Sequence, residues 1–425
     1  MATQMGIGLI GLGTVGSAVA RRLVEEWELL GRHGVTPVLR RVAVHDPARR
    51  RDLDLPRVQL DGDAEALVDD EAVAVVVEVM GGIDRASALL DRALRAGKPV
   101  VTANKAALAA HGLELAALAR ENGTSLRYEA AVGAGLPVVA LLRDSLRGDH
   151  VSGLEMIING TTNVILSGME KQGATLAEAL SDAQQRGFAE ADPSADVNGH
   201  DAAAKLLLLS RLAFDAPLTM DDVVTVGIGA VTAQDIGCAA LLGGSVKLVA
   251  LAQLDGDTVT MSVRPTVVLA GHPLHGIDDS ENAVLITSDL AGHVMVGGLG
   301  AGGNSTASAV VSDIVATVLA PAQAPPVPTS SPVVGDDGAV ERAGYVRVRL
   351  HPVADSAQLV IQALEDRGLT VEASALAQPA TGGDQELALR TGVVARNMLA
   401  RACETLDSLA VVDEVAAVMD CVGPS

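Results

Sequence analysis

A short glycine-rich turn near the N-terminus leaves few folds open to this chain. The turn reads Gly11-Leu-Gly-Thr-Val-Gly16, after an apolar run at residues 6–10 and before a segment of helical period at residues 14–30. Glycine at these three positions permits a tight turn, close approach of a pyrophosphate to the backbone, and close packing of helix on strand. An ordinary glycine-rich turn is the alternative, and the flanking strand and helix favour a dinucleotide site at the helix N-terminus.

The first 130 residues alternate short apolar runs with longer segments of helical period. Further strands are predicted at residues 39–44, 73–79, 99–102 and 125–128, because these runs are bounded by turn residues or charges. Apolar residues recur at steps of three and four in 84–96 and 112–120, which is typical of helices. This alternation predicts an α/β domain over residues 1–135 with a Rossmann-type, doubly wound parallel sheet.

Beyond residue 135 the alternation loosens. A helix is predicted at 136–146, a strand at 153–158, a helix from the capping box Thr175-Leu-Ala-Glu178 to about Gly187, and a helix at 201–213. Strand candidates punctuated by turns follow from 246 to 296. This order predicts a second, α+β domain over residues 136–320, whose last helix, near 304–320, packs back on the first domain.

A proline-rich stretch separates the C-terminal tail from the rest. Residues 321–328 read Pro-Ala-Gln-Ala-Pro-Pro-Val-Pro, whose prolines favour an extended linker, predicted over 321–340. Residues 341–425 then contain a strand, a helix, two strands, a helix and a strand, at 345–350, 357–366, 370–375, 387–391, 395–406 and 415–421. This is the order of a ferredoxin-like domain.

Charge and composition exclude two classes of partner. With 31 Lys and Arg against 53 Asp and Glu, the formal charge of -22 repels nucleic-acid backbones and anionic membrane surfaces. Only two Phe, two Tyr and one Trp are present, too few for base-stacking platforms or membrane-interface belts. Three widely spaced cysteines without a CxxC pair, and an N-terminus without a basic, apolar leader, predict a reduced, cytoplasmic protein.

A charged loop follows the predicted strand at 39–44 and reads His45-Asp-Pro-Ala-Arg-Arg-Arg51. An acid such as Asp46 at this place binds ribose hydroxyls and favours NAD, whereas Arg49 and Arg50 could bind a 2'-phosphate and favour NADP. A solvated surface loop is the alternative for any single arginine. The sequence predicts NAD(P), with NADP preferred, because a strongly acidic chain needs local positive charge to hold a polyanionic cofactor.

Residues 188–205 place several carboxylates ahead of one lysine, Lys205. The carboxylates are those of Glu190, Asp192, Asp196 and Asp201. Asp201 and Lys205 are four residues apart and share a helix face, so they could form an ordinary surface ion pair that stabilises by ~0.2–0.5 kcal/mol. Alanines precede Lys205 and leucines follow it, which predicts a mostly buried helix in which a lysine needs a partner or a function.

A second lysine, Lys105, follows the predicted strand at 99–102, in Thr102-Ala-Asn-Lys105. Ligands of open α/β sheets bind beyond the carboxyl ends of the strands, so Lys105 is a second candidate for the site. A surface residue at the start of a helix is the alternative interpretation.

Taken together, six motifs resemble the homoserine dehydrogenase family over residues 5–320. They are the turn at 11–16, Thr102-Ala-Asn-Lys105, Glu129-Ala-Ala-Val-Gly-Ala-Gly-Leu-Pro137, Ile158-Asn-Gly-Thr-Thr-Asn163, the segment 190–205 and Gly300-Ala-Gly-Gly-Asn-Ser-Thr-Ala-Ser-Ala309. The tail from Gly344 is similar to the ACT regulatory domain of many members. The family's Asp-Arg-Pro-Gly turn reads His351-Pro-Val-Ala-Asp-Ser356 here, so the resemblance does not extend to feedback by threonine.

The resemblance implies NAD(P)-dependent interconversion of L-homoserine and L-aspartate 4-semialdehyde, in the synthesis of threonine, methionine and isoleucine, by a homodimer or homotetramer. It implies catalytic roles for Lys205, which would transfer a proton, and for Lys105 and Asp201. The implied substrate-binding residues are Glu190, Asp196, Asp201 and Thr161. The implied cofactor-binding residues are Gly11, Gly13, Thr14, Val15, Gly16, Arg49, Arg50, Thr102, Lys105, Gly302 and Gly303. A Na+ ion would be held by main-chain carbonyls of Glu129, Val132, Ala134 and Leu136.

Two other functions are weighed against this one. A semialdehyde dehydrogenase that forms acyl phosphates would need a nucleophilic cysteine, and Cys238 is the only cysteine outside the tail. A catalytically idle regulatory protein that senses NAD(P) and an amino acid would not need Lys105 and Lys205. The presence of both lysines favours the enzyme.

Overall fold

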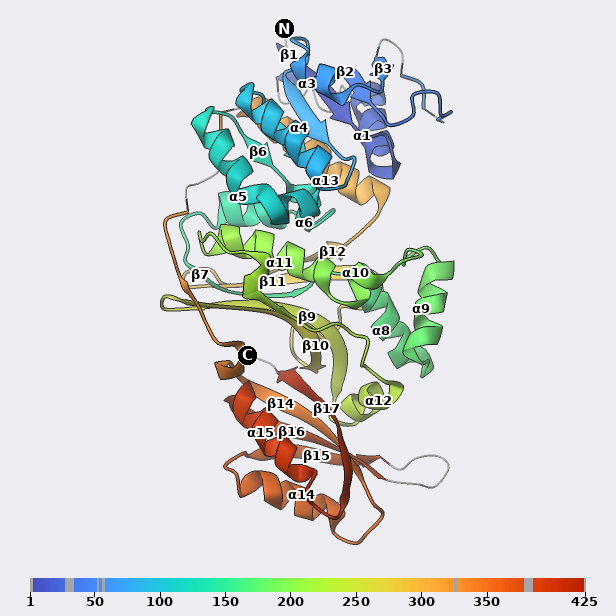
Figure 1. The fold of residues 1–425 in the computed structure, drawn as a ribbon, viewed down its shortest axis with the longest axis vertical. Coiled ribbons are helices and arrows are strands. Elements are labelled where there is room, and N and C mark those ends of the chain that lie inside the picture. Colours follow the sequence, from blue (N-terminus) through green and yellow to red (C-terminus); the bar gives the residue numbers. More distant parts are fainter. Residues whose placement is uncertain are drawn as a thin grey trace.

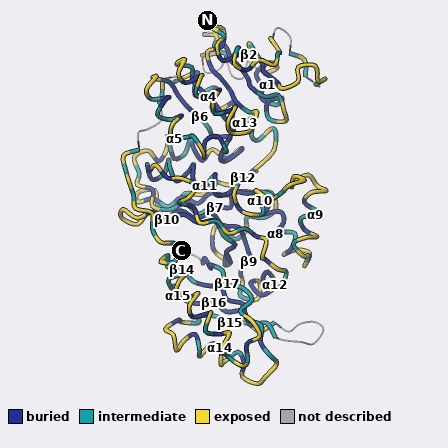
Figure 2. The backbone as a smooth tube through the Cα atoms, viewed as in Figure 1, coloured by how far each residue is buried: buried dark blue, intermediate teal, exposed yellow. Residues whose placement is uncertain are grey.

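The computed structural model describes residues 3–26, 34–51, 53–55, 58–320, 322–324, 328–377 and 385–423. These residues form a parallel sheet with helices at one end, a mixed sheet with helices in the middle, and the C-terminal strands and helices at the other end (Figure 1). Buried residues concentrate in the strands, and exposed residues lie on the outer helices and loops (Figure 2). No helix among the described residues is long and apolar enough to cross a membrane.

Six parallel strands form the N-terminal sheet, in the order β3-β2-β1-β4-β5-β6. They are β1 (Thr3–Ile10), β2 (Val35–Ala43), β3 (Gln59–Asp61), β4 (Val75–Glu78), β5 (Val100–Thr102) and β6 (Leu126–Arg127). The chain winds outward in one direction from β1 and in the other from β4, which is where such sheets bind ligands. The predicted doubly wound parallel sheet is confirmed.

Helices cover both faces of this sheet, so every residue of β4 is buried. One face carries α1 (Thr14–Glu25) and α13 (Gly303–Leu319), and the other carries α3 (Ala64–Asp69), α4 (Asp84–Arg95) and α5 (Lys105–Glu121). Helix α13 returns from far along the chain to pack on α1, and Val310 and Ile314 share one core with Val19.

Two helix boundaries differ from the predicted ones. Helix α1 ends at Glu25, and the predicted end at residue 30 lies outside the described residues. Helix α5 begins at Lys105 and not at residue 112. Its start is set by the side chain of Asn104, which accepts the backbone N–H of Ala107 at 3.1 Å.

The middle of the molecule is built on five antiparallel strands in the order β12-β11-β7-β9-β10. They are β7 (Val151–Ile157), β9 (Gly244–Asp255), β10 (Thr258–Leu269), β11 (Glu281–Ser288) and β12 (Gly292–Leu299), and the short strands β8 (Val223–Thr225) and β13 (Val333–Val334) also pair with β10. The α+β composition predicted for this region is confirmed.

The helices of this region are α8 (Gly160–Gln172), α9 (Leu176–Gln185), α10 (Ser194–Val197), α11 (His200–Ala213), α12 (Ala233–Leu241) and the 3-10 turn η2 (Met220–Asp222). The capping box of Thr175 and Glu178 at the start of α9 is confirmed. Helix α11 lies between α5 and the mixed sheet, and its residues Leu206 to Leu209 are all buried.

The helix predicted at 136–146 is observed from Val138 to Ser145, as α7 (Val138–Ala140) continued by the π-helical turn η1 (Leu141–Ser145). A separate short helix, α6 (Glu129–Val132), precedes it. The side chain of Glu129 accepts the backbone N–H groups of Val139 at 2.8 Å and Ala140 at 2.7 Å. Helix α7 is therefore capped by a residue of the preceding helix, α6, and not by one of its own flanking residues.

The tail has the predicted ferredoxin-like order. Its elements are β14 (Glu341–Leu350), α14 (Ser356–Glu365), β15 (Val371–Ala377), β16 (Gln385–Ala395), α15 (Arg396–Leu406) and β17 (Val412–Val422), after the 3-10 turn η3 (Asp337–Ala339). The strands pair antiparallel in the order β17-β14-β16-β15, and both helices share one apolar core with them.

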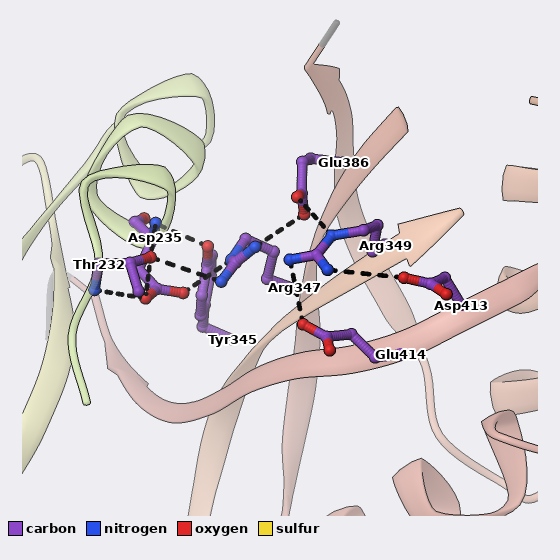
Figure 3. A network of polar contacts seen from close by, with 8 residues as sticks. All are labelled: Thr232, Asp235, Tyr345, Arg347, Arg349, Glu386, Asp413 and Glu414. Carbon is purple, nitrogen blue, oxygen red and sulfur yellow. Dashed lines mark hydrogen bonds and ion pairs between the residues drawn. The ribbon is translucent and has the colours of Figure 1, made fainter. Parts of the chain in front are cut away.

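The tail is joined to the middle region by a continuous sheet. Strand β17 pairs in parallel with residues 266–268 of β10, so one 11-stranded sheet runs through both parts. A buried polar network reinforces this joint: Arg347 of β14 lies between Asp235 of α12 and Glu386 of β16 (Figure 3). Of the proline-rich segment, residues 321 and 325–327 lie outside the described residues.

Candidate active site

A cavity of about 960 Å³ lies between the N-terminal sheet and the middle region. It opens beyond the carboxyl ends of β4 and β5, where doubly wound sheets bind ligands. Its walls come from the loop at 80–82 after β4, the start of α5, the start of α8, the segment 187–190, helix α11 and the loop at 299–302 before α13. Residues from both parts of the molecule therefore face one space.

The glycine-rich turn fits the edge of a dinucleotide site. Gly11 has φ +102°, and a Cβ on it would lie 2.8 Å from the carbonyl oxygen of Val79. A Cβ on Gly16 would lie 2.2 Å from the carbonyl oxygen of Gly11, whereas a Cβ on Gly13 would meet no atom within 4 Å. Gly11 and Gly16 are thus required by the turn and by helix packing, and Gly13 leaves open space for a ligand near the backbone.

Two helix N-termini meet at this turn. Helix α1 is preceded by Gly13 and helix α13 by Gly302, and neither has a side-chain cap. A Cβ on Gly303 would lie 2.7 Å from Cγ2 of Thr14, so the two helix starts are in close contact. Backbone N–H groups at an uncapped helix N-terminus suit a phosphate, so this junction can hold a pyrophosphate.

A carboxylate shared by two lysines lies deeper in the cavity. The Oδ2 atom of Asp201 is 2.8 Å from Nζ of Lys205, and its Oδ1 atom is 3.1 Å from Nζ of Lys105. The Lys205 ammonium also donates to the carbonyl oxygen of Ile158 at 2.9 Å. Burial favours the neutral acid, but the two lysine charges outweigh it and hold the pKa of Asp201 well below its usual range. The structure therefore brings together Lys205, Lys105 and Asp201.

The predicted substrate-binding residues lie on the same cavity. Glu190, Asp196 and Thr161 line it, together with Asp201. Glu190 is exposed, so its carboxylate is accessible, and the hydroxyl of Thr161 donates to the carbonyl oxygen of Phe188 at 2.9 Å. Thr161 therefore also fastens the segment that carries Glu190.

Two polar residues that were not predicted organise the cavity. Asn159, the N-cap of α8, donates its amide N–H groups to Asp196 and Asp201, and its place in the motif at 158–163 was the only signal. Glu78, at the end of β4, accepts the hydroxyl of Thr102 at 2.6 Å and the backbone N–H groups of Met80 and Gly81. Burial raises the pKa of Glu78 despite these bonds.

Thr102, a predicted cofactor-binding residue, is itself fully buried and is not part of the cavity lining. Its contact with the cavity runs through Glu78, which shapes the loop at 80–82. Thr102 therefore lies behind the site and supports it from there.

The turn predicted to bind Na+ borders the cavity. Val132 and Ala134 line it, whereas Glu129 and Leu136 do not. Ala134 has φ +51°, a backbone conformation that residues other than glycine adopt rarely. Burial raises the pKa of the Glu129 carboxyl, which caps α7, to about 7. The described residues contain no cluster of three His, Cys, Asp or Glu side chains suited to a metal.

A second cavity, of about 440 Å³, continues from the glycine-rich turn to the charged loop after β2. Asp46, Arg49, Arg51 and Arg85 line it, whereas Arg50 lies outside the lining. The Arg51 guanidinium donates to the carbonyl oxygens of Arg49 and Asp46, so Arg51 holds the loop together. Arg49 is thus the predicted arginine that faces this cavity.

Cys238 does not have the properties of a nucleophile. It is buried in α12 and outside the lining of the 960 Å³ cavity. Burial raises its pKa to about 11, the opposite of the shift that activates a thiol. The structure therefore gives no support to a semialdehyde dehydrogenase that forms acyl phosphates.

Comparisons with known proteins agree over most of the chain. A family model described as "Homoserine dehydrogenase, NAD binding domain" matches residues 11–129, and one described as "Homoserine dehydrogenase" matches residues 137–315. Homoserine dehydrogenase from Bacillus subtilis is 41% identical over 313 residues, which cover 73% of this chain and 72% of that protein. Homoserine dehydrogenase from Corynebacterium glutamicum is 44% identical over 319 residues, which cover 74% of this chain and 72% of that protein.

Solved structures extend the likeness to the tail. The crystal structure of a homoserine dehydrogenase from Thiobacillus denitrificans gives a TM-score of 0.91 at 32% identity and covers 100% of this chain and 99% of that chain. A hyperthermophilic archaeal homoserine dehydrogenase in complex with NADPH gives a TM-score of 0.63 at 27% identity. The match covers 75% of this chain and 98% of that chain. None of these matches supports a catalytically idle sensor. The chain belongs to the homoserine dehydrogenase family and is an NAD(P)-dependent oxidoreductase that acts on homoserine.

Proposed function

We propose that the 960 Å³ cavity is where L-homoserine and L-aspartate 4-semialdehyde are interconverted, with Lys205 as the proton carrier. The observation that carries this proposal is the Asp201 carboxylate, which pairs with both Lys205 and Lys105 in the cavity beyond the carboxyl ends of β4 and β5. When bound, the nicotinamide cofactor supplies the hydride acceptor or donor. The glycine-rich turn and the two uncapped helix N-termini fit its pyrophosphate.

Lys205 has the contacts that a positioned proton carrier needs. An ammonium group has three N–H donors, and two of them are directed to Asp201 and to the carbonyl oxygen of Ile158. No other partner for Lys205 is found among the described residues, so the third position is available to the substrate oxygen. As the neutral amine, Lys205 takes the hydroxyl proton when homoserine is oxidised. As the resulting ammonium, it returns that proton to the aldehyde oxygen in the reverse reaction.

The acidic side chains beside the lysines bind the substrate ammonium. Glu190, Asp196 and Asp201 line one cavity, and carboxylates form strong, charge-assisted hydrogen bonds to an ammonium group. Thr161 supports them by holding the carbonyl of Phe188. This arrangement holds the hydroxyl carbon of the substrate in a fixed orientation, which contributes to the rate by proximity.

The same proposal includes a Na+ ion held by main-chain carbonyls of Glu129, Val132, Ala134 and Leu136. The positive φ of Ala134 supports it, because a strained backbone conformation kept next to a ligand cavity points to a local function. Hard cations such as Na+ take oxygen ligands of this kind.

The proposal also assigns a separate role to each region of the chain. Residues 1–135 with α13 bind the cofactor, residues 136–320 hold the substrate, and residues 341–425 form an ACT-like regulatory unit after the linker at 321–340. The packing of α13 on α1 and the ferredoxin-like order of the tail support this division. A homodimer or homotetramer is supported by the edge strand β12, which exposes Met295.

NADP is the proposed cofactor, with its 2'-phosphate bound by Arg49. Arg49→Ala is expected to raise the KM for NADP+ by ~10-fold, because a guanidinium paired with a phosphate forms a charge-assisted hydrogen bond. The KM for NAD+ should change less than about twofold, because NAD+ lacks this phosphate. Steady-state oxidation of homoserine with each cofactor measures both constants.

Arg50→Ala is the matched control, since it removes the same charge from a neighbouring residue that lies outside the cavity lining. The arginine assignment is rejected if the two variants shift the KM for NADP+ equally. It is also rejected if Arg49→Ala weakens NAD+ as much as NADP+.

A further inference from the structure

Asn159 stands where α8 begins, between the mixed sheet and the cavity. It is only 5% exposed, and its side-chain oxygen accepts the backbone N–H of Thr162 at 2.8 Å and its hydroxyl at 2.9 Å. Its amide nitrogen donates to Oδ1 of Asp196 at 2.7 Å and to Oδ2 of Asp201 at 2.8 Å. A side-chain amide has two N–H donors and two acceptor lone pairs, so all of its hydrogen-bonding capacity is used.

The bonds of the amide nitrogen are not explained by helix capping. An N-cap needs only a side-chain oxygen, which serine or aspartate supplies as well as asparagine does. The orientation of the amide is fixed by its partners, because a flipped amide would place its oxygen against two carboxylates and its nitrogen against a backbone N–H. The nitrogen therefore has a separate task, which is to join two carboxylates that come from α10 and α11.

These two carboxylates would repel each other without a shared donor. Asp196 and Asp201 each place one oxygen within hydrogen-bonding distance of the same nitrogen atom. Like charges so close in a partly buried site are unfavourable unless donors lie between them. The two amide N–H groups supply this compensation without adding a charge.

Asn159 also fixes how Asp201 meets the lysines. The Oδ2 atom of Asp201 accepts both Asn159 and Lys205, which turns its Oδ1 atom toward Lys105. The residue before Asn159 contributes as well, since the carbonyl oxygen of Ile158 accepts Lys205. Residues 158 and 159 thus hold the carboxylate and the ammonium of the same ion pair.

We propose that Asn159 is a positioning residue that clamps Asp196 and Asp201 in the orientation in which they bind the substrate ammonium and direct Lys205. This inference rests on the proposed roles of these carboxylates. It goes beyond them because it assigns the orientation of the two carboxylates to an uncharged side chain. This side chain takes no part in the transfer of the proton or the hydride.

Asn159→Asp separates clamping from capping. Aspartate keeps an N-cap oxygen and nearly the same shape, but it replaces the amide donors with a third carboxylate. The expected result is a rise of ~10-fold or more in the KM for homoserine and a fall of ~10–100-fold in kcat, the scale of a misplaced catalytic constellation. The Kd for NADPH, measured by fluorescence titration, should stay within about twofold of wild type.

Two further variants fix the interpretation. Asn159→Ser keeps an oxygen cap and adds no charge, so it should also lose homoserine kcat/KM, by less than the aspartate variant. Asn122→Asp adds the same charge at the end of α5, where the amide of Asn122 donates to the carbonyl oxygen of Leu118. Its kcat and its KM for homoserine should equal those of the wild type. These comparisons remain decisive if Asn159→Asp fails to fold, because the serine variant then applies the same criterion.

The proposal is overturned if either Asn159→Asp or the folded Asn159→Ser variant retains a homoserine kcat/KM within twofold of wild type. It is also overturned if affinity for NADPH falls in parallel, which would indicate a general disturbance of the cavity. Asp196→Asn and Asp201→Asn are measured alongside. If these variants keep full activity the proposed substrate site fails, whereas if only the Asn159 variants keep it the clamp alone fails.

Discussion

Lys205→Ala is expected to lower the kcat for homoserine oxidation by ~10²–10⁴, the usual scale of general acid-base assistance. The fold should persist, because Asp201 keeps its ion pair with Lys105 and its hydrogen bond from Asn159. Affinity for NADPH should change little, since Lys205 lies on the substrate side of the cavity. Initial rates of cofactor reduction and a fluorescence titration with NADPH measure the two effects.

Lys205→Arg distinguishes proton transfer from charge. Arginine keeps the positive charge beside Asp201 but cannot give up its proton in a protein, so it should be impaired like the alanine variant. Lys171→Ala is the control, because Lys171 forms exposed ion pairs with Asp278 and Asp279 away from the cavity. An arginine variant with near wild-type kcat would show that Lys205 contributes charge and not a proton.

Arg347→Met is expected to lower the free energy of unfolding by ~3–5 kcal/mol, the cost of leaving a buried charge without its partner. The side chains of Arg347 and Asp235 are 4% and 2% exposed, and their 2.7 Å ion pair joins β14 of the tail to α12 (Figure 3). Methionine fills a similar volume but cannot pair with Asp235 or Glu386. Urea-induced unfolding followed by circular dichroism gives the change in stability.

Arg349→Met is the matched control for this prediction. Arg349 lies two residues along the same strand, and its side chain is 35% exposed. It pairs with the exposed side chains of Asp413 and Glu414, and it shares the largely buried Glu386 with Arg347. Exposed pairs of this kind contribute ~0–1 kcal/mol, so its replacement should cost much less. Equal losses in the two variants would contradict the assignment of Arg347 to a buried joint between the tail and the rest of the chain.

The doubly wound sheet could be predicted because its signals are local. Short apolar strands, helical periods and the glycine-rich turn each act within a few residues, and Gly11 and Gly16 have the tight contacts that such a turn requires. The first turns of α5, from Lys105, carry no apolar stripe in their alanine-rich sequence, so periodicity predicts the helix only from residue 112. Asn104, which caps that helix, would have been the useful signal.

Other features depend on contacts between distant parts of the chain. The start of the helix at Val138 is set by Glu129, which caps α7 by accepting backbone N–H groups, a contact that no periodicity reveals. The proline-rich segment predicts a tail that is separate from the rest of the chain. In the structure, however, β17 pairs with β10. The two strands are about 150 residues apart in the sequence, so no local pattern indicates that they pair. Sequence alone does not show which strand edges will meet.

In the candidate site, too, some residues could be predicted from local sequence patterns and others could not. Lys205 and Asp201 were found from their spacing on an apolar helix, and Lys105 from its place after a strand. Asn159 was not found, because an asparagine before a helix is explained by capping alone until its two carboxylate partners are seen. Arg49 and Arg50 could not be distinguished in the sequence, since the course of the loop decides which one faces the cavity.

The most direct test of the central claim is the steady-state rate of cofactor reduction by the wild-type chain with L-homoserine, measured by absorbance with NADP+ and with NAD+. We expect reduced cofactor to form only when homoserine and a cofactor are both present, with a higher kcat/KM for NADP+. A folded protein that binds NADPH but reduces neither cofactor in the presence of homoserine would contradict the account and favour a catalytically idle sensor.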